Sequence, residues 1–318
     1  GSAADAINET LELARRCEQW GYHRYWLAEH HATDGLAGCA PEVLLARLGS
    51  ETLTMRIGSG GIMLPHYSPY KVAENFKLLS TMYPARVDLG VGRAPGSSPY
   101  INSMLAYGSQ IGAEYFPQMV ADLDALLRDE EPPTPGMEKA RAYPLVEIPP
   151  ALWMLGSSDD SAQLAGHMGL PYCFAYFINS SIRPDIIHYY RDNFTASEVA
   201  EKSYSCLCPF VICADTDAEA ERLHKSRRLW YLGLLSRKEP GAIPSVEEAE
   251  NYKYSEHELA VLEANPRHII KGTPQTVKEE LMEMVEKYGV DELMIVTITY
   301  DFEARCRSYE LLAEAWAE

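Results

Sequence analysis

Short apolar segments of strand character alternate with longer amphipathic segments along the chain, and this alternation constrains the fold more than any other feature. The spacing of the apolar residues predicts strands at 22–29, 55–64, 86–92, 151–156, 172–178, 204–213 and 292–299. It predicts helices at 3–20, 40–52, 69–82, 114–129, 159–168, 183–194, 216–235, 274–288 and 302–316. Pro41, Pro69 and the pair Thr273-Pro274 supply the expected signals at three helix starts. Such an alternation is typical of a parallel sheet with helices outside it.

The order of these elements indicates the kind of parallel sheet. Seven predicted strands are each followed by a helix, whereas the helix at 3–20 precedes the first strand without a strand of its own. Eight strand-helix units that lack their initial strand predict an α/β fold, a (β/α)8 TIM barrel whose first strand is missing from this sequence. A doubly wound open sheet is the alternative. We expect one barrel domain over residues 1–318.

Three segments interrupt the alternation. Residues 94–113 and 130–149 are rich in Gly, Ser and Pro and flank one predicted helix. Residues 236–268 are polar and contain Pro240, Gly241 and Pro244. We expect all three to be loops or insertions, which in a barrel usually shape the mouth of the active site.

Charge and cysteine usage exclude several classes of protein. The net charge is −18, so neither nucleic acid nor an anionic membrane is an expected partner. No apolar run approaches the roughly 20 residues that cross a bilayer, and no signal peptide is visible. The 7 cysteines form no CxxC pair, which favours buried thiols in a reducing cytoplasm over a disulfide scaffold.

An acid and two imidazoles end the first predicted strand, in residues 25–31 (YWLAEHH). In a barrel of parallel strands, chemistry is done where the strands give way to their loops. Histidine titrates near neutral pH and can exchange a proton there. If strand geometry continues, His30 and His31 point to opposite sides, so chelation of one metal ion by both is awkward. His30 is therefore a candidate proton-transfer residue, and a hydrogen-bonded structural histidine is the alternative.

Three further clusters stand at strand ends. Residues 57–66 (IGSGGIMLPH) place three glycines in a strand, which indicates either a bulge or a flat ligand lying on the backbone. Arg93 ends the next strand and requires an anion, either a carboxylate or a phosphate. In residues 155–162 (LGSSDDSA) a strand ends where a helix begins, which is suited to a phosphate or to simple helix capping. Together the clusters favour a planar, phosphorylated cofactor.

These motifs resemble the bacterial luciferase-like monooxygenase superfamily. The resemblance is strongest in residues 25–31, in 58–65 (GSGGIMLP) and in 88–96 (DLGVGRAPG). It continues through 155–158 (LGSS), 169–171 (GLP) and 291–294 (DELM), in order and over nearly the whole chain.

The resemblance implies a barrel that binds FMN at its mouth, or a deazaflavin in some branches. It implies a flavin-dependent monooxygenase, in which reduced FMN and O2 form a C4a-hydroperoxyflavin that oxidises a small organic substrate. Because the chain has no GxGxxG nicotinamide fingerprint, we expect a separate flavin reductase to supply reduced FMN. A homodimer is also expected from the resemblance.

Matching positions assign the site. His30 is the catalytic residue beside the flavin, with Glu29 and His31 as its supports. Gly60 and Gly61 fall where luciferases carry a cis peptide against the flavin ring. The other cofactor-binding positions implied are Ser59 beside these glycines, Arg93, Ser157, Ser158 and Ser161 at the phosphate, and Tyr176 near the isoalloxazine. No metal is implied.

The sequence also departs from the light-emitting members. Gly92 stands where their catalytic subunit has a reactive cysteine, and their mobile-loop region is not recognisable after residue 236, so light emission is not predicted. Deazaflavin-dependent hydride transfer and flavin binding without turnover are the alternatives. A metal-dependent hydrolase using residues 29–31 is a further one, against which the strand alternation argues.

Overall fold

The computed structural model describes residues 1–94, 96, 98–107, 112–180, 185–197, 200–236 and 241–317. Pro95 of the arginine motif lies outside the described residues. So do parts of the predicted loops 94–113 and 236–268 and the first two residues of the predicted helix 183–194. Among the described residues, no helix is long and apolar enough to cross a membrane.

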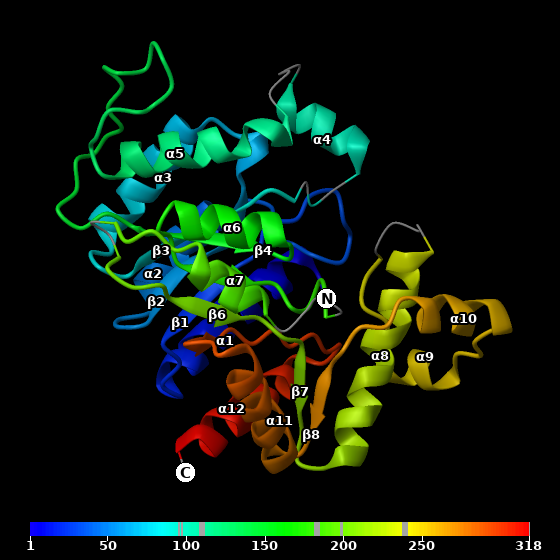
Figure 1. Ribbon diagram of the computed structural model, residues 1–318. Coiled ribbons are helices and arrows are strands. Elements are labelled where there is room, and N and C mark those ends of the chain that lie inside the picture. The colour runs from blue at the N-terminus through cyan, green and yellow to red at the C-terminus, as the bar shows by residue number, and fades with distance from the viewer. Residues whose placement is uncertain are drawn as a thin grey trace.

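A curled parallel sheet organises the molecule (Figure 1). Its strands lie in the order β1-β2-β3-β4-β5-β6-β9, and every neighbouring pair is parallel. Because the strands follow one another in space as they do in sequence, the sheet has no reversal point and is not doubly wound. This is the order of a (β/α)8 barrel without its first strand, with β1 and β9 as the two edges. The bounds are β1 Arg24–Leu27, β2 Arg56–Met63, β3 Val87–Gly92, β4 Ala151–Gly156, β5 Tyr172–Phe174, β6 Ser205–Leu207 and β9 Glu292–Leu293.

Helices cover the outer face of the sheet (Figure 1). Prolines begin α2, α3 and α11, as the sequence predicts, and Thr273 caps α11 through the backbone N–H of Thr276. Gly289 ends α11 in the left-handed conformation that suits a residue without a side chain. The bounds are α1 Ala3–Gln19, α2 Pro41–Glu51, α3 Pro69–Met82, α5 Phe116–Leu127, α6 Asp159–His167, α7 Ile186–Asp192, α11 Pro274–Tyr288 and α12 Phe302–Ala317, with short 3-10 turns at Leu64–His66 and Ala113–Tyr115.

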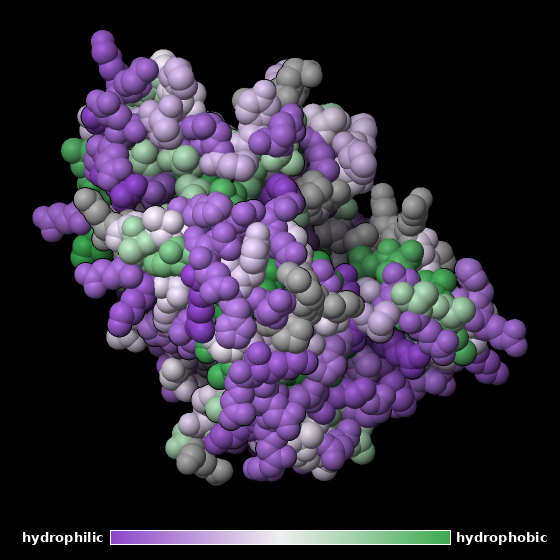
Figure 2. Space-filling view, in the orientation of Figure 1, coloured by the Kyte–Doolittle hydropathy of each residue, from purple (hydrophilic) through white to green (hydrophobic). Residues whose placement is uncertain are grey.

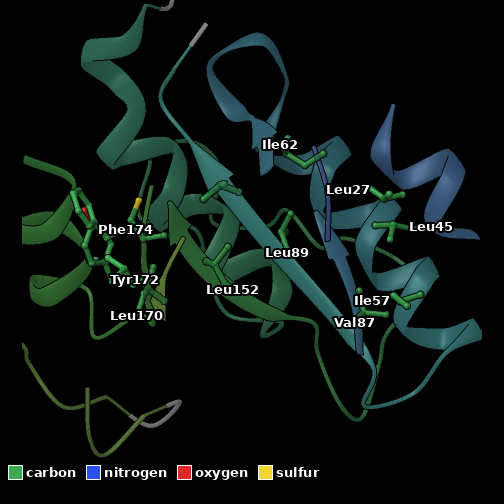
Figure 3. Close-up of a cluster of buried hydrophobic side chains, with 14 of the residues drawn as sticks. Leu27, Leu45, Ile57, Ile62, Val87, Leu89, Leu152, Leu170, Tyr172 and Phe174 are labelled. Carbon is green, nitrogen blue, oxygen red and sulfur yellow. The ribbon is translucent and has the colours of Figure 1, made fainter. Parts of the chain in front are cut away.

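The main core lies between the sheet and these helices, because strand side chains alternate between the two faces. Leu89 and Ile57 belong to this core, whereas Asp88 between its apolar neighbours points to the inside of the curl and binds Arg24 there. Figure 3 shows Leu27, Leu45, Ile57 and Leu89 packed together between the strands and α2. A smaller cluster of Trp153, Cys173, Cys206 and Cys208 fills the inside of the curl.

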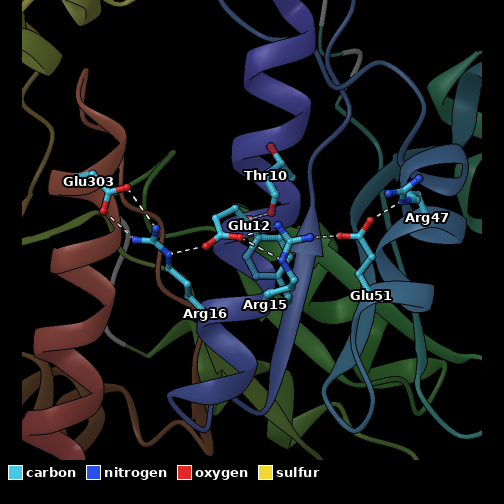
Figure 4. Close-up of polar contacts among 8 residues, drawn as sticks. Thr10, Glu12, Arg15, Arg16, Arg47, Glu51 and Glu303 are labelled. Atoms are coloured by element: carbon cyan, nitrogen blue, oxygen red, sulfur yellow. Dashed lines mark hydrogen bonds and ion pairs between the residues drawn. The ribbon is translucent and has the colours of Figure 1, made fainter.

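Ion pairs join α1 to its neighbours (Figure 4). Arg15 pairs with Glu12 and with Glu51 of α2, and Arg16 lies 2.8 Å from Glu303 of α12. These groups are largely solvated, so each pair contributes little to stability, about 0–1 kcal/mol. Their effect is to hold α1 in register between α2 and α12.

The structure corrects the predicted strand at 204–213. It is two strands, β6 and β7 (Val211–Cys213), separated at Pro209, whose ring nitrogen cannot donate a hydrogen bond to a neighbouring strand. β7 pairs instead with β8 (Ile270–Gly272), a strand that the sequence analysis missed because three residues carry too little periodicity. The predicted strand at 292–299 keeps pairing only at β9 and at one bridge, Phe210 to Val296.

Two of the predicted loops contain helices. Segment 94–113 holds α4 (Pro99–Ala106), and segment 236–268 holds α9 (Val246–Asn251) and α10 (Glu256–Ala264). Each begins at a serine cap, at Ser98, Ser245 and Ser255. α9 and α10 pack on α8 (Asp217–Leu235), which explains why weakly amphipathic segments are helical there. Segment 130–149 has neither helix nor strand, as predicted.

Candidate functional site

A cavity of about 1370 Å³ extends along the inside of the curl, from Arg24 and Glu292 at the amino ends of the strands to Arg93 and Ser157 at the carboxyl ends. Its wall is formed by β1 to β5, by the residues around β6 and β9, and by parts of α1, α8 and α12. Figure 2 shows a mostly hydrophilic surface that is hollowed between the region of α4 and the region of α8 and α10. A space of this size holds a cofactor together with a small substrate.

The two histidines at the end of β1 lie on different sides, as strand alternation predicts. His30 lines the cavity and His31 does not. Glu29 also borders the cavity, but its side chain is almost fully buried. Glu29 accepts hydrogen bonds from the backbone N–H of Met63 at 2.9 Å and from the hydroxyl of Tyr67 at 2.6 Å, and it lies 2.7 Å from Nε2 of His31. The carboxylate therefore fastens the end of β1 to the end of β2 and fixes the loop that carries His30.

The His30 side chain is half-buried, and its ring makes no hydrogen bond to any residue that the structure describes. Burial lowers its pKa, and the negative charge of Glu29 offsets only part of that effect. At neutral pH the imidazole is therefore uncharged, with one ring nitrogen as a donor and the other as an acceptor. Both nitrogens are available to a molecule in the cavity.

Gly60 and Gly61 of β2 stand both at an irregularity of the strand and at the cavity. The pairing of β2 with β3 shifts between Gly60 and Ile62, which is the expected bulge, and Gly60 and Gly61 also line the cavity. The peptide bond between them is cis. A Cβ on Gly61 would lie 2.5 Å from the carbonyl oxygen of Gly90, so the close approach of β3 requires glycine there.

Ser59 does not line the cavity. Its side chain is fully buried, and its hydroxyl donates to the carbonyl oxygen of Gly90 at 3.0 Å. The alternation along β2 directs it outward, away from the side where the cavity lies.

Arg93 and the start of α6 meet at one corner of the cavity, which we call the β3–α6 corner (Arg93, Ser157, Ser158, Asp160 and Ser161). Arg93 is half exposed, and its only described ion pair is a long one, 3.4 Å from Nη2 to Oδ2 of the exposed Asp160. Ser158 is the N-cap of α6, and the hydroxyl of Ser161 donates to the carbonyl oxygen of Ser158 at 2.7 Å. Free backbone N–H groups at a helix start together with a guanidinium are suited to an anion.

Tyr176 lies behind the wall instead of on it. Ala175 and Phe177 line the cavity, whereas Tyr176 packs between Phe174 and Tyr288 of α11. Its hydroxyl lies 3.0 Å from Nδ1 of His268, and burial raises its pKa to about 12. The backbone after β5 continues to alternate sides, which brings Phe177 to the cavity in its place.

The sequence analysis did not predict one part of the cavity wall. Arg227, Trp230, Tyr231 and Leu234 project from one face of α8, and Arg267 and Phe210 stand beside them. Their spacing of three, four and seven residues is a helical stripe. This periodicity is visible in the sequence. It predicts an amphipathic helix, but it does not show that one face of the helix lines a cavity.

Ion pairs join the strands at their amino ends, which form the other end of the cavity. Arg24 of β1 lies 2.6 Å from Asp88 of β3 and 2.7 Å from Glu292 of β9, and Arg56 also pairs with Asp88. Arg24 stacks on Trp153, with its guanidinium carbon 4.8 Å from the ring centroid. Among the residues that the structure describes, no three His, Cys, Asp or Glu side chains come together in a way that could hold a metal ion.

Comparison with known proteins identifies the family. The family model of luciferase-like monooxygenases matches residues 1–292. YceB of Bacillus subtilis is 41% identical over 317 residues, covering 98% of this chain and 94% of YceB. The N-acetyl-S-alkylcysteine monooxygenase of the same organism is 36% identical over 315 residues, covering 99% of this chain and 93% of that protein.

Solved structures show the same fold. The crystal structure of apo-MsnO8 superposes with a TM-score of 0.89 at 34% identity, covering 99% of this chain and 93% of that one. More distant structures, with 20% identity or less, include a type II Baeyer-Villiger monooxygenase constituent in complex with FMN and an F420-dependent secondary alcohol dehydrogenase, with TM-scores of 0.68 and 0.61. They share the barrel architecture. The family match over most of the chain, together with relatives aligned along nearly its full length, shows that this protein belongs to the luciferase-like monooxygenase family of oxidoreductases.

Proposed function

We propose that this enzyme is an FMN-dependent monooxygenase, which uses reduced flavin and O2 to oxidise a small organic substrate. The observation that carries the proposal is the β3–α6 corner, where an arginine with one weak partner meets a helix start at the edge of a large cavity. An FMN phosphate fits that chemistry, since it is a compact dianion with several acceptor oxygens.

The wall beside that corner fits a flat ring system. Among the described residues, a Cβ on Gly92 would have only the carbonyl oxygen of Leu155 within 4 Å, at 3.8 Å, so space opens beside the end of β3. Gly60 and Gly61 extend this side-chain-free wall towards His30. We propose that Arg93, Ser157, Ser158 and the start of α6, where Ser158 and Ser161 form a capping box, hold the phosphate, and that Gly60 and Gly61 face the ring. Ser59 and Tyr176 have no place in this assignment because both lie behind the wall.

The bound flavin supplies the redox chemistry with O2. The protein positions the reacting groups and donates or accepts protons. His30, held uncharged by burial, offers an N–H donor or an acceptor nitrogen at the edge of the cavity. Glu29 and Tyr67 hold the loop that orients it. The aromatic side chains beyond β5 and β6 exclude water from the reacting groups.

Replacement of Arg93 by alanine tests the cofactor assignment. Arg93→Ala is expected to weaken FMN by about 1.5–3 kcal/mol, because one charge-assisted contact is lost, and to leave riboflavin nearly unchanged. Flavin fluorescence titration measures both affinities. Arg47→Ala on α2 is the control, since Arg47 does not line the cavity. Equal losses for FMN and riboflavin would show that Arg93 does not contact the phosphate.

Deazaflavin-dependent hydride transfer is the second candidate, because a structure with this fold is described as F420-dependent. Titration with FMN and with F420 separates the two candidates, and tight F420 with weak FMN binding refutes the first. Incorporation of labelled oxygen from O2 into a product, lost in His30→Ala, separates a monooxygenase from a flavin-binding protein without turnover. N-acetyl-S-alkylcysteines and aliphatic aldehydes are suitable first substrates.

We further propose that a separate reductase delivers the reduced flavin and that the enzyme works as a homodimer in the cytoplasm. All seven cysteines are free thiols, which supports a reducing compartment. Coupled assays with an added flavin reductase, and sedimentation of the purified enzyme, test the first two statements.

A further inference from the structure

Arg227 is a buried cation that forms no ion pair with any residue that the structure describes. It lies on α8 and lines the cavity, yet only 2% of its surface is exposed. Within the described part of the chain, no hydrogen bond or ion pair involves its guanidinium, and its Nε is buried without any acceptor. Burial of a charge without a partner is costly, so such groups are rare unless they have a function.

The other buried charges of the described chain are all satisfied. Glu29 accepts hydrogen bonds from Met63 and Tyr67, Lys77 donates to the carbonyl oxygen of Ala142, and Asp88 pairs with Arg24 and Arg56. Asp122 accepts from the backbone and the hydroxyl of Thr134. Arg227 is therefore the exception among the described buried charges, in a chain that otherwise places a partner beside each one.

Aromatic stacking stabilises Arg227 without using its hydrogen bonds. The guanidinium carbon lies 3.8 Å from the ring centroid of Phe210 and 5.9 Å from that of Tyr231. Stacking occupies the face of the guanidinium, whereas its N–H donors lie in the plane and point past the rings. Burial and the neighbouring Arg267 lower the pKa of Arg227 to about 10, so it remains charged at neutral pH.

Arg267 adds a second cation, and no carboxylate among the described residues forms an ion pair with it. Its Nε donates to the hydroxyl of Tyr231 at 3.1 Å and its Nη1 to the carbonyl oxygen of Phe177 at 2.8 Å. Two arginines side by side without an acid are notable in a chain of net charge −18, since carboxylates are abundant elsewhere. The electrostatic potential at this part of the cavity wall is therefore positive, which favours the binding of an anion.

We propose that Arg227, assisted by Arg267, binds the carboxylate of the substrate. The substrate class is an organic acid whose apolar body packs on the aromatic wall formed by Phe177, Phe210, Trp230 and Tyr231. This position is separate from the β3–α6 corner, because the corner stands at the ends of β3 and β4, whereas Arg227 lies on α8, which packs against β7 and β8 (Figure 1). The inference rests on the proposed function, in which the corner is taken by the cofactor phosphate and the rest of the cavity by substrate.

A pair of probes that differ only in charge tests the proposal. Octanoate and octanamide are titrated into the flavin-free protein by calorimetry, with wild type, Arg227→Met, Arg227→Gln and Arg228→Met. Arg228 is the matched control, since it is the exposed neighbour on the same helix and does not line the cavity. We expect octanoate to bind the wild type and the Arg228 variant alike, and both Arg227 variants at least tenfold more weakly, with octanamide unaffected.

Thermal unfolding of the same variants separates binding from folding. Because the replaced charge has no partner, Arg227→Met is expected to unfold at the same or a higher temperature than the wild type. A large loss of stability in both Arg227 variants would show a structural role and would overturn the proposal. So would the absence of octanoate binding to the wild type, or an equal loss for octanoate and octanamide.

The phosphate of the cofactor is the alternative to the substrate carboxylate as the anion that Arg227 binds. If Arg227→Met weakens FMN but not riboflavin, Arg227 contacts the phosphate and the substrate assignment fails. Because the octanoate titration uses no flavin, its result stands whether or not FMN proves to be the cofactor. Failure of FMN binding in the wild type would instead refute the proposed function alone.

Discussion

Adjacent residues in this protein have unlike tasks because the backbone sends them to different surroundings. Glu29 is buried at the edge of the cavity, where its carboxylate binds Met63 and Tyr67, whereas His30 lines the cavity with its ring nitrogens available. Arginines divide in the same way: Arg93 stands half exposed beside Asp160, and Arg227 is buried against Phe210. The side chain sets which chemistry is possible, and burial decides whether that chemistry serves folding or binding.

Substitution of two glycines near neighbouring strand ends separates an effect on binding from an effect on folding. Gly92→Val places methyl groups in open cavity space, since the carbonyl oxygen of Leu155 is the only described atom within 4 Å of its Cβ. We expect normal folding and at least a tenfold loss of FMN affinity in fluorescence titration, because the side chain occupies the space that we assign to the flavin.

The matched variant is Gly61→Ala. Its Cβ would meet the carbonyl oxygen of Gly90 at 2.5 Å, so the clash falls on the backbone of β3 instead of the cavity. We expect a loss of unfolding free energy of about 1–3 kcal/mol in urea titration. Unchanged FMN affinity in the Gly92 variant would contradict our placement of the flavin.

At the scale of elements, the two faces of each segment determine the site. β5 and the residues after it send Tyr172 and Phe174 outward into the core, while Cys173, Ala175 and Phe177 face the cavity. α8 presents one stripe to the cavity and packs with α9, α10 and β8 through its other faces. An element of the barrel therefore serves as scaffold and as wall at once.

His224, on α8 against β8, makes this packing sensitive to pH. Its Nδ1 lies 3.0 Å from Nζ of Lys271, and burial together with that charge lowers the pKa of His224 from 6.5 to about 4. Between these two values the unfolded chain binds the proton and the folded chain does not, so stability falls as pH falls through this window. The contribution is about 3 kcal/mol at most, and no further loss from this group follows below about pH 4.

His224→Gln removes the titration while keeping a polar side chain. Urea unfolding of both proteins at pH 7 and near pH 4 is the measurement, and the carboxylates cancel because they are common to both. We expect the variant to gain stability relative to the wild type as the pH is lowered. Parallel pH profiles would show that His224 is not held uncharged.

At the scale of the whole molecule, the two ends of the curl differ. The amino ends of the strands are joined by the ion pairs of Arg24, Asp88, Arg56 and Glu292, which connect edge strand β1 with edge strand β9. The carboxyl ends carry the β3–α6 corner and His30 around the wider part of the cavity. A rigid base beneath a wide mouth leaves the mouth available for binding.

Removal of one carboxylate from each of two ion-pair networks tests how much the network at the amino ends of the strands contributes. Asp88→Asn leaves Arg56 without a described charge partner and leaves Arg24 with Glu292 alone, around a carboxylate that has no exposed surface. We expect a loss of about 3–5 kcal/mol in unfolding free energy. Glu303→Gln removes the exposed partner of Arg16, and we expect less than about 1 kcal/mol. Similar losses in the two variants would contradict the assignment of Asp88 as a buried support.

The sequence by itself determined the class of fold and the strand ends that carry the site. Alternation along strands and the 3.6-residue period of helices are local properties, so they placed β1 to β5 and separated His30 from His31. Residue types at strand ends also indicated the β3–α6 corner, because serines that follow a strand and begin a helix are visible without a structure.

Only the tertiary structure decided which segments meet. Arg227 and Phe177 are separated by 50 residues, and no local pattern shows that both face one cavity or that Arg227 lacks a partner there. The same holds for Tyr176, which sequence matching placed beside the flavin and which the structure places against Tyr288. β7 and β8 are three-residue strands that exist because each pairs with the other. Burial and pairing depend on the positions of distant segments, so they follow from the folded chain and not from any local stretch of it.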